Sequence, residues 1–410
     1  MKAISTTYDV AIIGGGASGL AAALSCARAG GRPVVLERDV EAGLSILATG
    51  NGRCNLSNAR IDPERYRHPD VAQAVFGEEP ERELAAFFLS TGIVTCEVEG
   101  RLYPFSKRAE SVRDALLRAC EREGARILPC CDIQKATRTR DVWELAALLP
   151  RRTPRGKRGA DAKANLRARR RELADAERIE HRIAARSVII ACGGTSRETA
   201  ALFGLPHLAE HPVLCPLSCS LPDQPGALKA LDGLRVDAKL TLYRGGAGVW
   251  SEAGEVLFRP YGISGIAAFN LSRRARPGDA IEIDPFYPLT PQELSDVFSK
   301  RSLALGAGPD SGPSWFDGFL ARPIASVLSQ AKARSLRLQV EGTADERSAQ
   351  VRRGGIPFDA VELPDLRVRP DLAPQVLACG EALDMDADCG GYNLAWAWAS
   401  GLRAGAAALA

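Results

Sequence analysis

The chain of 410 residues is 46% apolar and 25% charged, with a formal net charge of +3. This composition indicates a globular protein of about two or three domains and excludes a disordered or fibrous chain. The eleven cysteines are odd in number and include no C-x-x-C pair, which predicts reduced thiols in a cytoplasmic protein. No stretch approaches the roughly 20 apolar residues that span a bilayer, and the four histidines share no ligand spacing, so we expect neither a membrane segment nor a metal site.

The first 37 residues predict a β-turn-α-β unit. A short β-rich run at 8–13 is followed by an alanine-rich, helix-prone segment at 17–29 and a second strand at 33–37. The turn between the first strand and the helix is GGGASG. This arrangement of strand, glycine turn and helix is typical of a dinucleotide-binding domain.

Gly14, Gly16 and Gly19 have the spacing G-x-G-x-x-G. The first glycine makes the tight turn, the second lets the backbone approach a pyrophosphate, and the third lets the helix pack closely on the strand. The helix start at Ala17 and Ser18 offers unpaired N–H groups to the anion. Glu37 ends the next strand, where a carboxylate accepts hydrogen bonds from a ribose 2′-OH, and this leaves FAD and NAD as alternatives.

The sequence ILATGNGRCNLSN at 46–58 predicts a second loop at the cofactor. Gly50 and Gly52 permit close backbone approach, while Asn51 and Asn55 offer donors and acceptors. Arg53 is suited to neutralise a pyrophosphate or an acidic substrate. A simple glycine and asparagine turn is the alternative.

Segment 151–182 carries most of the basic character of the chain, with twelve Lys and Arg against five Asp and Glu. Its first half predicts a disordered or surface loop, and its second half, at 166–182, has helical propensity. A solvated surface insertion is the favoured interpretation, and a nucleic-acid or membrane-surface contact is the alternative. The strand-like run that follows, at 187–194, ends in Gly193 and Gly194.

Residues 196–341 differ in kind, because proline-punctuated alternating runs give way to helical stretches from Pro291 onward. We expect an inserted substrate or cap domain here, flanked by a discontinuous cofactor domain at 1–195 and 342–410. The sequence YGISG is a candidate flavin-facing turn, in which Tyr261 or Ser264 would touch the substrate.

The C-terminal region decides between the two cofactors. A strand at 375–379 ends in Gly380 and Glu381, whose carboxylate is suited to bind a ribityl chain. Gly390 and Gly391 then precede Tyr392, Asn393 and a helix, whose N-terminus would face an electron-rich ring. Because NAD has neither a ribityl chain nor a flavin, these features favour FAD over NAD. An acidic loop that caps a C-terminal helix is the alternative.

Five stretches together resemble the YhiN and BaiN type of NAD(P)/FAD-dependent oxidoreductases, a family that includes bile-acid dehydro-intermediate reductases and aminoacetone oxidases. They are GGGASGLAAA, ATGNGRCNLSN, GRLYPFSKRAESVRDAL, GEVLFRPYGISGIAAFNLS and CGEALDMDADCGGYNLAWAWASG. The resemblance implies an α/β fold, with a Rossmann-like, two-dinucleotide-binding-type FAD domain built from both termini and an inserted β-barrel-like plus helical domain. The basic segment 151–182 is foreign to the pattern.

The resemblance also places Thr49 to Asn55 along the cofactor. The full predicted cofactor set is Gly14, Gly16, Ala17, Ser18, Gly19, Glu37, Arg38, Thr49, Gly50, Asn51, Gly52, Arg53, Cys54, Asn55, Ile133, Gly193, Gly194, Gly380, Glu381, Gly390, Gly391, Tyr392, Asn393 and Leu394. The flavin carries the chemistry, so no catalytic side chain is assigned beyond the candidates Tyr261, Ser264 and Tyr392. A reactive thiol at Cys54 or Cys389 is less favoured than simple packing.

We therefore expect an FAD-dependent oxidoreductase acting on a small-molecule substrate by hydride transfer at flavin N5. A second glycine-rich nucleotide motif is missing from the middle of the chain, so NAD(P)H would bind transiently in the substrate cleft of a reductase. One alternative is an amine oxidase that uses oxygen. Another is a flavin-bearing protein that associates with RNA through 151–182, a role weakened by the lack of interleaved aromatic residues.

Overall fold

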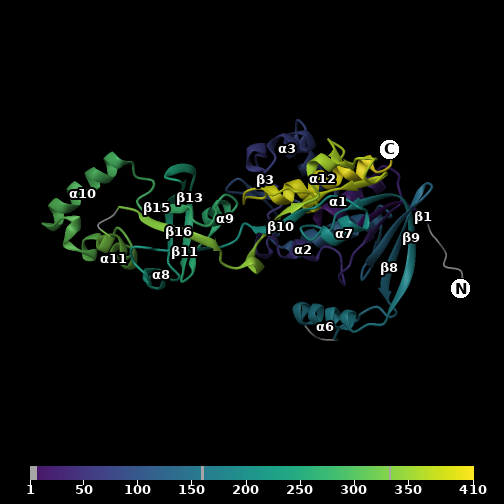
Figure 1. The fold of residues 1–410 in the computed structure, drawn as a ribbon, viewed down its shortest axis with the longest axis horizontal. Helices are drawn as coiled ribbons and strands as arrows, with labels where there is room; N and C mark the ends of the chain where they lie inside the picture. Colours follow the sequence, from purple (N-terminus) through teal and green to yellow (C-terminus); the bar gives the residue numbers. More distant parts are fainter. Residues whose placement is uncertain (1–6, 158–160, 332–333) are drawn as a thin grey trace. The chain divides into compact units, whose positions relative to one another are not determined.

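The computed structural model describes residues 7–157, 161–331 and 334–410 and divides into two compact units (Figure 1). Unit 1 consists of Met1–His211 and Arg352–Ala410, and unit 2 is Pro212–Val351. Residues 158–160, which belong to the predicted basic segment, lie outside the described residues. Within the described parts of the chain, no helix has the length and apolar character needed to cross a membrane.

Unit 1 is built on a nine-stranded sheet whose parallel centre comes from both ends of the chain. β1 (Thr7–Ile13) pairs in parallel with β2 (Pro33–Leu36) and with the second half of β9 (Arg178–Ile190). β9 in turn pairs in parallel with β20 (Val376–Ala378), and β2 with β6 (Arg126–Leu128). The paired centres of these strands are fully buried, as at Val10, Val34, Val188 and Val376, which is expected for parallel strands covered on both faces. The predicted strands at both termini are confirmed.

The remaining strands of unit 1 extend this sheet or form small ones beside it. β18 and β19 pair antiparallel beyond β20, and β7 and β8 form a hairpin that joins the first half of β9. The bounds of all these remaining strands are β3 Ser57–Asn58, β4 Thr95–Val98, β5 Arg101–Pro104, β7 Asp132–Thr139, β8 Val142–Pro150, β10 Leu208–Val213, β17 Val351–Gly355, β18 Val361–Glu362 and β19 Arg367–Val368.

The first and last long helices of unit 1, α1 (Ala17–Arg28) and α12 (Tyr392–Ala407), pack against each other (Figure 1). Glycines allow this close approach: a Cβ on Gly401 would lie 2.3 Å from the carbonyl oxygen of Ser18, and one on Gly405 would lie 2.3 Å from that of Ala22. The two ends of the chain therefore form one core. The other helices of unit 1 are α2 Leu44–Leu47, α3 Pro69–Phe76, α4 Pro80–Ser90, α5 Ala109–Arg122, α6 Ala162–Ala174 and α7 Arg197–Leu202.

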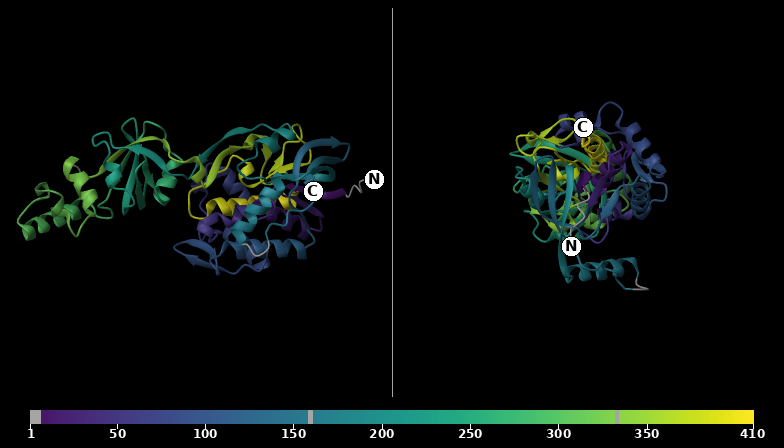
Figure 2. Two further views of the ribbon diagram at one scale, coloured as in Figure 1. Left: turned by 90° about the horizontal axis from the view of Figure 1, so that it is seen from below. Right: turned by 90° about the vertical axis from the view of Figure 1, so that its right-hand side faces the viewer.

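The basic segment contains more regular structure than predicted. Residues 162–174 form α6, beside the long β8 and β9 ribbon (Figure 2). The predicted helical propensity holds only to Ala174, because Arg178–Arg182 are the first residues of β9 and pair with β8. Helix propensity is a weak prior that strand pairing overrides here.

Unit 2 contains a closed barrel and a group of helices (Figure 2). The barrel order is β11-β14-β13-β12-β15-β16. The bounds are β11 Leu217–Ser220, β12 Arg235–Arg244, β13 Ala247–Arg259, β14 Gly262–Ser264, β15 Ala280–Asp284, β16 Leu336–Thr343, α8 Ala227–Ala230, α9 Ile266–Ser272, α10 Pro291–Leu305 and α11 Arg322–Ala331. Together with unit 1, this barrel and these helices confirm the predicted α/β fold, with its two-terminus Rossmann-like domain and barrel-plus-helix insertion.

Candidate cofactor site

The glycine turn after β1 has the backbone conformation and close packing that the G-x-G-x-x-G spacing predicts. Gly14 has φ of +109°, and a Cβ there would lie 2.4 Å from the carbonyl oxygen of Ala191. A Cβ on Gly19 would lie 2.0 Å from the carbonyl oxygen of Gly14, so only glycine lets α1 start this close to β1. Around Gly16, by contrast, the nearest atom is the Ser45 hydroxyl at 3.1 Å. The turn is therefore closely packed on its protein side, and Gly16, with a single neighbour within 4 Å, is its least crowded position.

Helix α1 begins at this turn, and its N-cap Gly16 makes no side-chain capping hydrogen bond. The N-terminal N–H groups of a helix attract anions, so the start at Ala17 and Ser18 suits a pyrophosphate. α12 repeats the arrangement, because its N-cap Gly391 also lacks a side-chain cap and has φ of +100°. Leu394 lies in the first turn of α12 and is half-buried. The site thus has two uncapped helix N-termini, one from each end of the chain.

Glu37 lies directly beside the glycine turn. Its Oε2 accepts a hydrogen bond from the Gly15 N–H at 2.8 Å, and its Oε1 accepts one from the Asp39 N–H at 2.7 Å. Each carboxylate oxygen keeps a second lone pair for a ribose hydroxyl. Arg38 points to solvent and pairs with Glu198 at 3.6 Å. Ile133 lies next to this region, because the N–H of Cys131, two residues earlier, donates to the Glu37 carbonyl.

The loop at 49–55 is joined to the C-terminal glycines rather than lying free. In its hydrogen-bonding orientation, the Asn55 amide accepts from the Gly391 N–H at 3.0 Å and donates to the Ser57 carbonyl at 2.9 Å. The Asn58 amide donates to the Gly390 carbonyl at 3.0 Å. Asn55 therefore ties the two loops together, a structural role that the sequence did not reveal.

The rest of this loop divides between exposed and buried residues. Gly50 and Asn51 both have left-handed φ, near +56° and +52°, and are exposed. A left-handed asparagine is uncommon, and such conformations concentrate at functional sites. The Arg53 guanidinium lies over the Tyr103 ring at 5.6 Å, and the Thr49 hydroxyl donates to the Ile46 carbonyl at 2.7 Å. Gly52, with φ of +79°, has open space around it.

Cys54 faces the core, where its exposed fraction is 0%. Burial raises the pKa of its thiol to about 11, although a hydrogen bond with Thr49 acts in the opposite direction. We expect Cys54 to resist iodoacetamide at pH 8 in the folded protein and to react in urea, because only the thiolate is nucleophilic. Peptide mass spectrometry would measure this, with the half-buried Cys96 as the comparison. Rapid labelling of folded Cys54 would instead support a reactive thiol.

Gly380 and Glu381 follow β20 and face the residues that end β9 and begin α1. A Cβ on Gly380, where φ is +66°, would lie 2.4 Å from the Ser18 hydroxyl oxygen. Glu381 Oε1 accepts from the Arg352 N–H at 2.6 Å, and a Cβ on Gly194 would lie 3.0 Å from the same oxygen. Burial raises the Glu381 pKa to about 7. Gly194 therefore leaves space for this carboxyl group, which is partly protonated near neutral pH, whereas a Cβ on Gly193 would have no atom within 4 Å.

Three buried aspartates were missed by the sequence prediction. Asp384, Asp386 and Asp388 are at most 3% exposed. Asp386 pairs with the Arg353 guanidinium at 2.8 Å, and Asp384 lies 3.2 Å from that of Arg67. A carboxylate at every second position of an otherwise apolar run was the signal that could have found them. These pairs fix the loop between Glu381 and α12.

The three candidate catalytic residues, Tyr261, Ser264 and Tyr392, do not all belong to the same unit. Tyr392 lies in unit 1, where its ring packs edge-on against Tyr66 at 5.9 Å, and burial raises the pKa of its phenol. Its neighbour Asn393 binds the Ala387 backbone through both amide atoms, at 2.8 and 2.9 Å. Tyr261 is 39% exposed and, like Ser264, belongs to unit 2. Their contact with substrate stays a prediction.

The residues of unit 1 fit FAD. The Gly16 position of the glycine turn and the uncapped start of α1 suit the pyrophosphate, and Glu37 suits the adenosine ribose. Glu381 and the N-terminus of α12 suit a ribityl chain and a flavin ring. Among the residues that the structure describes, no group of three or more potential ligands could hold a metal ion.

Comparisons with known proteins show which family the chain resembles over most of its length. Residues 8–148 match the HI0933-like protein Rossmann domain. The chain is 30% identical to a 3-dehydro-bile acid delta(4,6)-reductase from Clostridium scindens, over 97% of this chain and 98% of that protein. It is 23% identical to a ribosomal RNA dihydrouridine synthase from Haemophilus influenzae, over 95% of each.

A solved structure of a 3-ketosteroid-delta4-(5alpha)-dehydrogenase from Rhodococcus jostii RHA1 is 14% identical to the chain, with a TM-score of 0.46 and coverage of 98% of this chain and 97% of that one. The family assignment comes instead from the full-length match at 30% identity and from the Rossmann-domain match. These confirm the resemblance drawn from the sequence motifs. The chain belongs to the HI0933-like family of FAD-dependent oxidoreductases, the YhiN and BaiN type.

Proposed function

We propose that the protein is an NAD(P)H-linked reductase that saturates a carbon–carbon double bond conjugated to a carbonyl group. When bound, FAD supplies hydride transfer at flavin N5. The observation that supports the proposal is the packing of both chain ends into one unit, with Glu37 bonded to the glycine turn before α1 and Glu381 beside Gly194 at the end of β9. This arrangement provides positions for both halves of FAD.

The names of two relatives support the type of bond. A 3-dehydro steroid with delta(4,6) unsaturation carries its double bonds in conjugation with a ketone. Uridine becomes dihydrouridine by saturation of a double bond conjugated to a ring carbonyl. Both names describe addition of hydrogen to an electron-poor C=C bond, so the shared chemistry is the same although the substrates differ in size.

The protein groups that would assist are the N-termini and the acids around the site. The N-terminus of α12 carries partial positive charge, which would stabilise negative charge on the reduced flavin ring. Glu37 would orient the adenosine ribose and Glu381 the ribityl chain. Tyr261 and Ser264 are proposed to contact the substrate from unit 2. We favour a small enone as substrate, because the relative that acts on a steroid is the more similar one.

Anaerobic mixing with NADH or NADPH tests the reductase. We expect one of the two to bleach the visible absorption of the bound flavin, and a conjugated enone to restore it without oxygen. A panel should include a 3-keto-4,6-dienic steroid, cyclohexenone, a saturated ketone as control, and uridine-containing RNA. If RNA is the only compound that restores the flavin absorption, the substrate is a nucleic acid rather than a small enone. Flavin that neither nucleotide bleaches would show the NAD(P)H-linked reductase to be wrong.

A further inference from the structure

The basic helix α6 packs directly on the segment that follows Glu37. Val40, Cys130 and Leu173 are at most 8% exposed and form a small cluster of their own, against which Leu44 and Leu166 also pack. Leu166 and Leu173 belong to α6, whereas Val40 and Leu44 belong to the segment 37–44. α6 therefore has an apolar face with a specific partner in unit 1, which a purely solvated insertion would lack.

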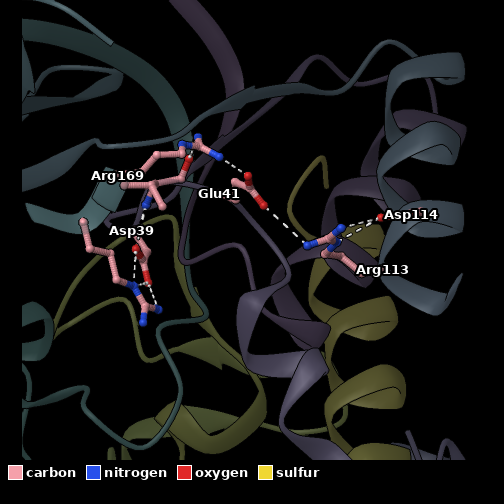
Figure 3. Close-up of polar contacts among 7 residues, drawn as sticks. Asp39, Glu41, Arg113, Asp114 and Arg169 are labelled. Carbon is pink, nitrogen blue, oxygen red and sulfur yellow. Dashed lines mark hydrogen bonds and ion pairs between the residues drawn. The ribbon is translucent and has the colours of Figure 1, made fainter. Parts of the chain in front are cut away.

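Ion pairs also join α6 to this segment (Figure 3). Arg170 binds Asp39 through two nitrogens, with its Nε 3.1 Å from each carboxylate oxygen. Arg169 pairs with Glu41 and also donates to the Val40 carbonyl at 2.8 Å. Glu41 in turn lies 3.4 Å from the Arg113 guanidinium of α5. Two successive arginines of the insertion thus bind two acids that follow the predicted ribose-binding glutamate.

The contacts continue from this segment to the glycine turn. The Asp39 N–H donates to Glu37 Oε1 at 2.7 Å, and Glu37 Oε2 accepts from the Gly15 N–H at 2.8 Å. The Gly43 N–H donates to the Gly15 carbonyl at 2.7 Å. Segment 37–44 is therefore bonded to the glycine turn at both ends, and α6 holds its middle.

The charges around Asp39 favour the contact between α6 and segment 37–44. Burial acts to raise the Asp39 pKa, but hydrogen bonds from Arg170 and from the Val40 N–H outweigh it and hold that pKa below its usual value. α6 is also secured at its flanks, where the Glu172 carboxylate accepts from the Arg155 and Gly156 N–H groups at 2.8 and 3.2 Å. Arg151 pairs with Glu177 at 3.0 Å. Of the twelve basic side chains in segment 151–182, Arg151, Arg169 and Arg170 are thus paired with acids of unit 1.

We infer that α6 is a latch that fixes the ribose-binding segment 37–44, with Arg169 and Arg170 as positioning residues for the adenosine half of FAD. This inference rests on the FAD site proposed above and adds a role for the insertion. The latch orients Glu37 through Asp39 and therefore affects the binding of the adenosine half of FAD. The C-terminal loop would hold the flavin half. Because both ion pairs are partly exposed, salt should weaken the latch.

The test uses ADP, which shares the adenosine and phosphates of FAD and carries no flavin. We expect the full-length Arg169→Gln/Arg170→Gln variant, freed of FAD, to bind ADP about three- to tenfold more weakly than the native apoprotein by calorimetry. The native affinity should fall as salt rises from 50 to about 500 mM, and the variant should show much less of this dependence. Bound FAD should also dissociate faster from the variant, as followed by flavin fluorescence.

Arg167→Gln is the matched control, because Arg167 is an exposed arginine of the same helix. It removes one charge and should leave ADP affinity unchanged. Arg170→Lys should restore part of the affinity, and Arg170→Gln should have little further effect in an Asp39→Asn background. Equal ADP affinity in the double variant and the native protein would overturn the latch, even if the variant binds RNA less well. The reductase proposal fails separately, through flavin that NAD(P)H does not bleach.

Discussion

Replacing Gly19 by alanine is expected to lower the FAD content of the purified protein and its melting temperature. A Cβ at this position would lie 2.0 Å from the Gly14 carbonyl oxygen, and that oxygen belongs to the turn itself. Because backbone atoms cannot rotate away, α1 must shift from β1 by about 1 Å, and overpacking of this kind costs about 1–3 kcal/mol. The shift also moves the helix N-terminus away from the pyrophosphate, so FAD affinity should fall about tenfold or more.

Gly308→Ala is a matched control for this substitution. A Cβ on Gly308, which lies in unit 2, would have no atom within 4 Å. We expect this variant to keep the yellow colour, the FAD stoichiometry and the melting temperature of the native protein. The visible spectrum and the flavin released on heating give the FAD content, and a thermal melt gives the stability. A Gly19→Ala protein that retains one FAD per chain would show that the glycine turn does not hold the pyrophosphate.

The parts of the fold that depend on local sequence could be predicted. The turn at Gly14, Gly16 and Gly19 could be predicted because the spacing of glycines reports the backbone conformation directly. The parallel strands at both ends could be recognised as short buried runs that finish in glycines. The joining of the two termini followed from these runs, since ligands bind at the carboxyl ends of parallel strands.

The parts that depend on distant pairing could not be predicted. Asp39 meets Arg170 across 131 positions of the chain, and nothing local to either residue indicates the other. The Asn55 amide accepts a hydrogen bond from the Gly391 N–H, at the far end of the sequence, which no local pattern indicates, and its contact with the cofactor stays a prediction. Likewise, Arg178–Arg182 have helical propensity as a peptide and become a strand only because β8 provides a partner. Tertiary contacts decide each of these cases.

Glu381 should make the stability of the FAD-free protein fall as pH rises from about 5 to 8. Its pKa is about 7 in the folded protein because burial disfavours the charged carboxylate, against 4.5 for an ordinary glutamate. Below pH 4.5 the group is neutral in both states and contributes no difference. Between these values the unfolded chain releases the proton while the folded protein keeps it, so the free energy of unfolding decreases with pH. Well above pH 7 Glu381 is charged in both states, so its effect on the free energy of unfolding no longer changes with pH.

The expected size is about 1–3 kcal/mol, because one pKa unit corresponds to about 1.4 kcal/mol and the side chain keeps some contact with solvent. Glu381→Gln cannot ionise and retains an oxygen for the Arg352 N–H. Melting temperatures measured from pH 5 to 8 should therefore fall less in this variant than in the native apoprotein, whereas Glu362→Gln, at an exposed site, should follow the native curve. Parallel curves for all three proteins would mean that Glu381 is ionised throughout. A charged Glu381 can only accept hydrogen bonds from ribityl hydroxyl groups, whereas a protonated one can also donate one, so the same titration bears on how this acid can hold the cofactor.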